Sequence, residues 1–128
     1  MSKSKLDTFG PYTPIRQAGD YYFISGQVGV HQGTGRAHQS VVEQAVQVLD
    51  NLKYVLKTKD LDLKDVVKTT IYLTDINDFT SVNEVYSSVF KSIKPARSTV
   101  EVSSLPSVAG DTKLLIEIDA IAYKKDGH

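Results

Sequence analysis

Hydrophobic and polar residues alternate along much of the chain in the manner of β-strands. Tyr21 to Val28 is rich in aromatic and β-branched residues and predicts a strand. The same pattern predicts further strands at Val66 to Leu73, Ala96 to Val102 and Leu114 to Tyr123. A loop from Leu105 to Lys113, with Pro106 and Gly110, separates the last pair.

Apolar residues at helical spacing fill the segments between the strands. The first helix begins after Ser40. Ser40 and Glu43 have the spacing of a capping box. Its apolar face comprises Val42, Ala45, Leu49, Leu52 and Leu56. The second helix contains Phe79, Val82, Tyr86, Val89 and Phe90. It ends before Pro95, because proline disfavours helix at the preceding residue.

This order of elements predicts an α+β or α/β domain over residues 1–128, with both helices on one face of the sheet. In the last strand, the alternate residues Leu114, Ile116, Ile118, Ala120 and Ala122 would pack under the helices. In the preceding strand we expect Ser98, Val100 and Val102 there.

The opposite face would carry Arg97, Thr99 and Glu101 beside Leu115, Glu117, Asp119, Ile121 and Tyr123. A half-apolar sheet face suits a subunit interface better than open water, so we expect a homo-oligomer. The alternative is an ordinary surface with scattered apolar residues.

Composition narrows the classes of function. Lys plus Arg and Asp plus Glu each number 15, so the formal net charge is zero and nucleic acid is not the expected main partner. The chain has no cysteine, which excludes disulfides, thiolate catalysis and Cys-based metal sites. Met1 to Lys5 is followed by no apolar stretch, and no apolar run reaches membrane-spanning length. We therefore expect a cytoplasmic protein, unless an organellar signal has been removed.

Arg97 and Glu117 are the candidate chemical pair, predicted on the same face of neighbouring strands. The alternative is a cross-strand salt bridge, worth about 0–1 kcal/mol when exposed. From the residues alone the salt bridge is favoured, because structural ion pairs outnumber catalytic ones.

Several segments of the chain, taken together, favour a catalytic role for Arg97 and Glu117 over a salt bridge. They are Gly10-Pro11-Tyr12, Ser25-Gly26-Gln27, Val66 to Thr70, Asn77-Asp78-Phe79, Val82 to Tyr86, Pro95 to Val100 and Ile116 to Ala122. In this order they resemble the Rid (RidA/YjgF) family of reactive-intermediate deaminases. The resemblance runs through nearly the whole chain.

The resemblance implies a chorismate-mutase-like α+β fold and a homotrimer whose sheets form a central barrel, with active sites in clefts between subunits. It implies hydrolysis of 2-imino acids or their enamine tautomers, of the 2-aminoacrylate and 2-iminobutyrate type, to 2-keto acids and ammonia. Neither cofactor nor metal is expected.

Arginine binds a carboxylate bidentately, so Arg97 is expected to anchor the substrate. Glu117 would direct or deprotonate the attacking water. By resemblance, Tyr12, Ser25 and Asn83 also line the site. The alternatives are an interface aromatic, a turn hydroxyl and a solvent-facing helix residue, respectively. Thr99 stands where some members of the family carry cysteine, and it offers a hydroxyl instead.

One segment departs from the family. The loop Pro106 to Lys113 makes the spacing between Arg97 and Glu117 longer than usual, which would bring in Asp119 if the strand register shifted. His31, His38 and His128 show no metal-ligand spacing.

Two rival functions remain open at this stage. One is a non-catalytic regulatory protein that binds a small carboxylate at Arg97. The other is an RNA-acting translation inhibitor or ribonuclease, against which the zero net charge speaks.

Overall fold

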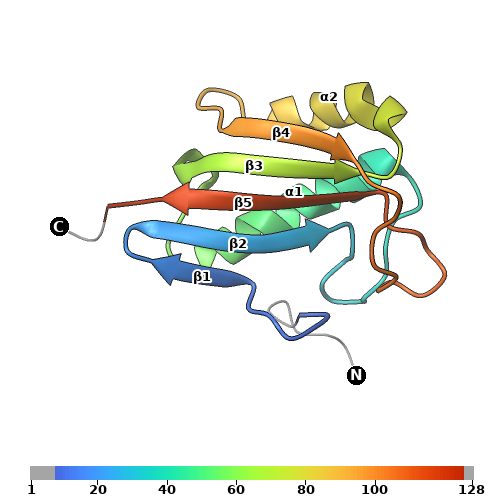
Figure 1. Ribbon diagram of the computed structural model, residues 1–128, viewed down its shortest axis with the longest axis horizontal. Coiled ribbons are helices and arrows are strands. Elements are labelled where there is room, and N and C mark those ends of the chain that lie inside the picture. The colour runs from blue at the N-terminus through green and yellow to red at the C-terminus, as the bar shows by residue number, and fades with distance from the viewer. Residues whose placement is uncertain (1–7, 126–128) are drawn as a thin grey trace.

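A five-stranded mixed sheet organises the fold (Figure 1). The computed structural model describes residues 8–125, so the predictions that concern Met1 to Lys5 and His128 lie outside the described residues. The strands are β1 (Ile15–Ala18), β2 (Tyr21–Val28), β3 (Val66–Leu73), β4 (Ala96–Glu101) and β5 (Ile116–Tyr123). Their order is β1-β2-β5-β3-β4, and only the β3–β4 pair is parallel.

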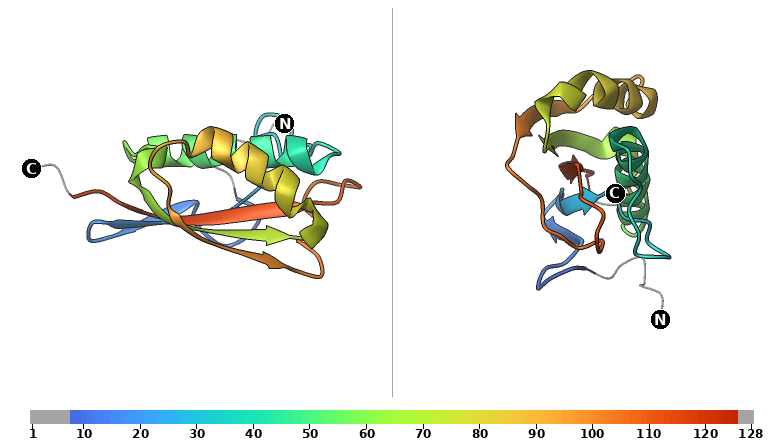
Figure 2. Two further views of the ribbon diagram at one scale, coloured as in Figure 1. Left: turned by 90° about the horizontal axis from the view of Figure 1, so that it is seen from above. Right: turned by 90° about the vertical axis from the view of Figure 1, so that its right-hand side faces the viewer.

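The helices α1 (Val41–Lys57) and α2 (Phe79–Val89) cover one face of this sheet (Figure 2). Short 3-10 turns, η1 (Leu63–Asp65) and η2 (Ile76–Asp78), precede β3 and α2. The predicted capping box of the first helix is formed in part. The Ser40 hydroxyl accepts from the Glu43 backbone N–H at 3.1 Å, but the Glu43 carboxylate accepts from that hydroxyl and not from a backbone N–H. The predicted α+β fold, with both helices on one side of a mixed sheet, is confirmed. No helix within residues 8–125 combines the length and apolar character needed to span a bilayer.

The main core lies between the helices and the sheet. Side chains of α1 such as Leu49 and Leu52 pack there with the alternate β5 residues Ile116, Ile118 and Ala120. All five are almost completely buried, as alternation in β5 predicts. The remaining alternate residues, Glu117 among them, therefore point to the face without helices.

The strands differ from the expected ones in three places: β1 is additional, β4 ends at Glu101 rather than at Val102, and β5 begins later. The short strand β1 was not predicted, because four residues are too few to show a clear alternation. β5 begins at Ile116 rather than at Leu114. Leu114 instead packs with Val28 and Val30 in a second small core, which the segment containing Leu105 and Val108 covers.

The predicted neighbours and faces of β4 are wrong. β3 lies between β4 and β5, so the strands of Arg97 and Glu117 do not pair. Arg97 is in register with Thr69, whose side chain is fully buried, and it contacts α2, so it lies on the helix-covered face. Val100, expected in the core, is exposed on the open face.

The prediction for β4 is wrong because β4 is a strand at the edge of the sheet. The residues of β4 alternate only weakly in polarity, with Ala96, Ser98 and Val100 against Arg97, Thr99 and Glu101. The guanidinium of Arg97 stacks on aromatic rings of α2, so its charge does not force the side chain to the open face.

Apolar side chains remain uncovered on the open face. Tyr21, Phe23, Val100 and Tyr123 are each at least 40% exposed there. Tyr21 and Tyr123 are paired across β2 and β5, and their rings meet edge to face at 5.1 Å. Exposed aromatic and β-branched residues on one face of a sheet are typical of a surface that a partner covers.

A buried glutamine, Gln44, joins α1 to the segment that precedes it and to the residues that lead into β5. The amide of Gln44 donates to the carbonyls of His38 and Lys113 at 2.8 and 3.0 Å, and its oxygen accepts from the Leu115 N–H at 2.8 Å. Gly29 leaves space for it, since a Cβ at that position would lie 2.6 Å from the Gln44 Cβ. The start of β5 is thereby fixed against α1.

We predict that Gln44→Ala lowers the free energy of unfolding by about 2–3 kcal/mol, because three backbone groups lose their partner. Gln39→Ala is the matched control, because Gln39 is exposed and makes one long bond of 3.4 Å. Denaturant unfolding of both variants at equal protein concentration measures the difference. Equal, small effects would show that the Gln44 bonds do not hold these segments.

Candidate active site

Arg97 lies under α2 with its guanidinium stacked on aromatic rings. The guanidinium carbon is 4.9 Å from the centre of the Tyr86 ring and 5.4 Å from that of Phe79. Within residues 8–125 Arg97 forms no hydrogen bond and no ion pair. The salt bridge to Glu117 considered above is therefore not formed within the chain. Stacking holds the plane of the guanidinium and leaves its N–H groups available at the edge.

Tyr86 is itself held in place from below. Its hydroxyl shares a 2.7 Å hydrogen bond with Thr69, the residue that pairs with Arg97 across β3 and β4. Burial raises the pKa of Tyr86, although the Thr69 bond and the charge of Arg97 oppose that rise. The ring is thus neutral near neutral pH and presents its π face to the cation.

A cavity of about 300 Å³ opens beside this stack. Its lining residues come from α2 and from the turn that leads into β4: Asn83, Tyr86, Ser87, Phe90, Lys94, Pro95 and Arg97. Asn83 Oδ1 and Thr99 Oγ1 are buried without a hydrogen-bond partner. Buried polar atoms are normally paired, so unpaired atoms beside a free guanidinium indicate a place for a polar ligand. We call Arg97, Asn83 and Thr99 the Arg97 group.

Glu117 lies on the open face, where β2 bulges between Ile24 and Gln27. Gly26, inside the bulge, faces the carboxylate so closely that a Cβ there would collide with Glu117 Oε2. Only glycine leaves this space, which gives the Ser25-Gly26-Gln27 segment a physical role.

Burial raises the pKa of Glu117, and the nearby charge of Asp119 raises it further. Glu117 has no hydrogen-bond donor within the described part of the chain, whereas Asp119 accepts from the Tyr72 hydroxyl at 2.9 Å. Asp119 is thus already engaged, and Glu117 is the carboxylate that remains available. Glu117, and not Asp119, is the β5 carboxylate that faces Gly26.

Ser25 lies in the same β2 bulge as Gly26, and its hydroxyl ties the bulge to the segment that contains Tyr12. The Ser25 hydroxyl donates to the Thr13 carbonyl at 2.6 Å, so its oxygen retains only acceptor capacity. Tyr12 precedes Thr13 in the chain and is 45% exposed. We call Glu117, Ser25 and Tyr12 the Glu117 group.

The sheet separates the two groups within one chain. Arg97 shares a face with Thr69 and Ala120, and Glu117 shares the other with Tyr72. The structure therefore brings the predicted site residues together in two sets, and not into one cavity. Arg97 and Glu117 therefore do not meet within one copy of the chain.

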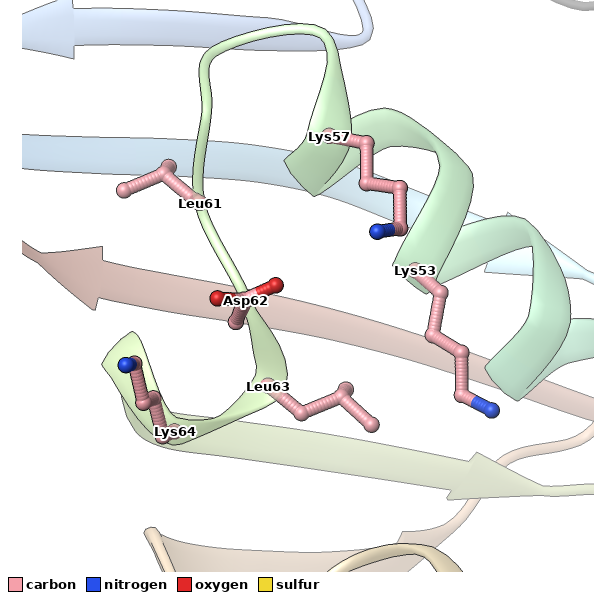
Figure 3. A pocket seen from close by; sticks show the side chains of 6 residues that line it. All are labelled: Lys53, Lys57, Leu61, Asp62, Leu63 and Lys64. Carbon is pink, nitrogen blue, oxygen red and sulfur yellow. The ribbon is translucent and has the colours of Figure 1, made fainter.

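Other cavities lack this combination. One of about 360 Å³ lies at the end of α1, lined by Lys53, Lys57, Leu61, Asp62, Leu63 and Lys64 (Figure 3). Its ammonium groups lie apart from one another and do not converge on one point. Among residues 8–125, no three His, Asp or Glu side chains gather as metal ligands would.

Some residues of the site escaped the sequence analysis. The sequence predicts Tyr86 and Phe79 on the apolar face of a helix and in two segments of the family resemblance, but neither pattern indicates their contact with Arg97. Gly26 was visible as part of a motif, but its contact with Glu117 depends on the bulge. Lys94, another cavity residue, directly precedes the Pro95-Ala96-Arg97 segment, but only the fold shows that it lines the same cavity as Arg97.

The chain is similar in sequence to known proteins over almost its whole length. The family model described as "Endoribonuclease L-PSP" matches residues 2–124. A RutC family protein of Pyrococcus horikoshii is 45% identical over 117 residues, covering 91% of this chain and 89% of its own. The "2-iminobutanoate/2-iminopropanoate deaminase" of Mus musculus is 42% identical, covering 90% and 82%.

Solved structures of similar proteins have the same fold as this chain. The crystal structure of the YjgF gene product from E. coli superposes with a TM-score of 0.84 at 37% identity, covering 95% of this chain and 96% of that one. The match includes the sheet and both helices that position Arg97 and Glu117. The chain therefore belongs to the Rid (YjgF) family, whose family model carries the Endoribonuclease L-PSP description.

Proposed function

We propose that this protein is a deaminase that hydrolyses 2-imino acids, or their enamine tautomers, to 2-keto acids and ammonia. The observation that supports it most is the free guanidinium of Arg97 at the edge of an aromatic-walled cavity, beside unpaired buried polar atoms. The deaminase name of the mouse relative supports the same reaction.

The proposed catalyst is a homotrimer with active sites between subunits. Its sheets would pack through the exposed apolar residues of the open face, which no part of residues 8–125 covers. In this arrangement the Arg97 group of one copy faces the Glu117 group of the next. A closed ring of three such heterologous contacts makes three equivalent sites.

Substrate binding begins at Arg97. Its planar fork matches a carboxylate and can form two parallel charge-assisted hydrogen bonds. The apolar walls supplied by Tyr86 and Phe90 strengthen those bonds by excluding water. Asn83 and Thr99 then find partners in the ligand or in the neighbouring copy.

Hydrolysis proceeds at the carbon next to that carboxylate. Glu117 removes a proton from water as the water oxygen attacks the C=N carbon, and it passes that proton to the nitrogen to give a carbinolamine. Glu117 then takes the hydroxyl proton as C=O forms and gives it to the nitrogen as the C–N bond breaks and ammonia departs. A raised pKa suits a carboxylate that must both accept and donate a proton. Ser25, which keeps an acceptor oxygen, and Tyr12 would orient the water and close the cleft.

The proposal is tested by forming 2-iminobutyrate in situ with an amino acid oxidase. Semicarbazide traps the imine, so an active deaminase lowers the rate of semicarbazone formation. Binding of 2-ketobutyrate without any such decrease would instead support a regulatory carboxylate-binding protein. Salt-sensitive cleavage of RNA by the purified protein would support the activity that the family description names.

We predict that Arg97→Lys lowers kcat/KM for 2-iminobutyrate roughly 10- to 100-fold, because a point charge replaces the bidentate fork. Arg97→Ala should abolish turnover while the oligomer stays folded. Arg16→Lys, an exposed change on β1, is the matched control and should leave the rate unchanged. Normal turnover in Arg97→Ala would refute the anchor role.

We predict that Glu117→Gln slows hydrolysis but still permits binding of 2-ketobutyrate, since Arg97 remains. Binding is followed by calorimetry and turnover by the semicarbazone assay. If binding and turnover fell to the same extent, Glu117 would be a structural residue.

The pH profile provides a further prediction. A base must be ionised, so activity falls as pH drops through the raised pKa of Glu117. Asp119→Asn removes the smaller of the two causes of that rise, and the acid limb of kcat/KM should move to lower pH without reaching that of an exposed carboxyl. The wild-type profile with the same substrate corrects for ionisation of the imine. An unmoved acid limb would show that another group controls it.

A further inference from the structure

A second cation lines the cavity that contains Arg97. Lys94 stands in the turn between α2 and β4, and its ammonium donates to the Lys91 carbonyl at 2.8 Å. That bond turns the ammonium back toward the end of α2. The site as described above uses Arg97 alone and gives Lys94 no role.

The charge of this cavity is uncompensated. No carboxylate is among its lining residues, and neither Lys94 nor Arg97 forms an ion pair within residues 8–125. Two cations beside the apolar walls of Tyr86, Phe90 and Pro95 repel each other more strongly than they would in water. An anion with two separated charges would relieve that repulsion.

Besides Arg97, the ammonium of Lys94 is the charged donor that the cavity offers to a second acid group. The Ser87 hydroxyl spends its proton on the Glu84 carbonyl at 3.1 Å and can only accept. Asn83 presents an unpaired oxygen, which suits an N–H, and its own amide N–H groups are uncharged, so they bind a carboxylate less strongly than an ammonium does. An ammonium already bonded to one carbonyl keeps two N–H donors.

We propose that the preferred substrates are dicarboxylic imino acids of four or five carbons. Arg97 holds the carboxylate next to the C=N carbon, and Lys94 holds the distal carboxylate. The inference rests on the proposed deaminase function, since it names the substrate class of that same site. A cavity of about 300 Å³ has room for a molecule of this size.

The simpler role for Lys94 is structural, as a cap of the turn through the Lys91 carbonyl. A cap would contribute to folding and would treat all substrates alike. Discrimination between substrates with one and two carboxylates therefore separates the two roles.

The experiment compares imines made in situ from 2-aminobutyrate and from glutamate. For Lys94→Gln we expect kcat/KM to fall about tenfold with the dicarboxylic imine and to stay within about twofold with the monocarboxylic one. Lys94→Arg should restore the preference. Lys91→Gln is the control, because it removes the same charge from an exposed residue that does not line the cavity.

Binding of the product acids makes the result independent of turnover. Calorimetry should show that the wild type binds 2-ketoglutarate more tightly than 2-ketobutyrate, and that Lys94→Gln removes the difference. Equal loss for both acids, or no loss for either, would overturn the inference while leaving the deaminase proposal intact. A dicarboxylate preference without turnover of any imine would instead overturn the deaminase proposal and retain the second-carboxylate site.

Discussion

The pleat of one β-sheet keeps Arg97 and Glu117 apart. Successive side chains of a strand point to opposite faces, and the register puts Arg97 with Thr69 under the helices and Glu117 with Tyr72 on the open side. No side-chain movement carries either residue through the sheet. The chemistry proposed for the pair therefore requires two copies of the chain, and the exposed aromatic residues of the open face give those copies a reason to associate.

Each group is preorganised by its own surroundings. The rings of Tyr86 and Phe79 fix the guanidinium without neutralising it, so its hydrogen-bonding edge is kept for a ligand. On the other face, Gly26 makes room for Glu117, and burial raises its pKa. A cation without an anion and a carboxylate without a hydrogen-bond donor lower the stability of a folded chain unless a ligand or another copy of the chain supplies the missing partner.

Local pattern predicted most of the fold, because the helices and long strands carry strong periodicity. Residues 21–28 and 66–73 form strands as expected, and the cap at Ser40 is formed. The face of β4 was mistaken because an edge strand of six residues alternates weakly and because aromatic support allows an arginine to lie under a helix. The family resemblance named the site residues, but their division between two faces depends on strand order, which periodicity does not encode. Lys94 was missed since only folding places it beside Arg97.

Mixed oligomers test most directly whether each site draws on two copies. Arg97→Ala and Glu117→Gln, each nearly inactive alone, are unfolded together in equal amounts and refolded. In a random trimer, about one site in four then combines an intact Arg97 with an intact Glu117. The account predicts recovery of about a quarter of wild-type deaminase activity for this pair, and none when Arg97→Ala is mixed with the double variant Arg97→Ala/Glu117→Gln, because no copy then has Arg97. Mixed trimers no more active than their separate parents would contradict a site shared between subunits.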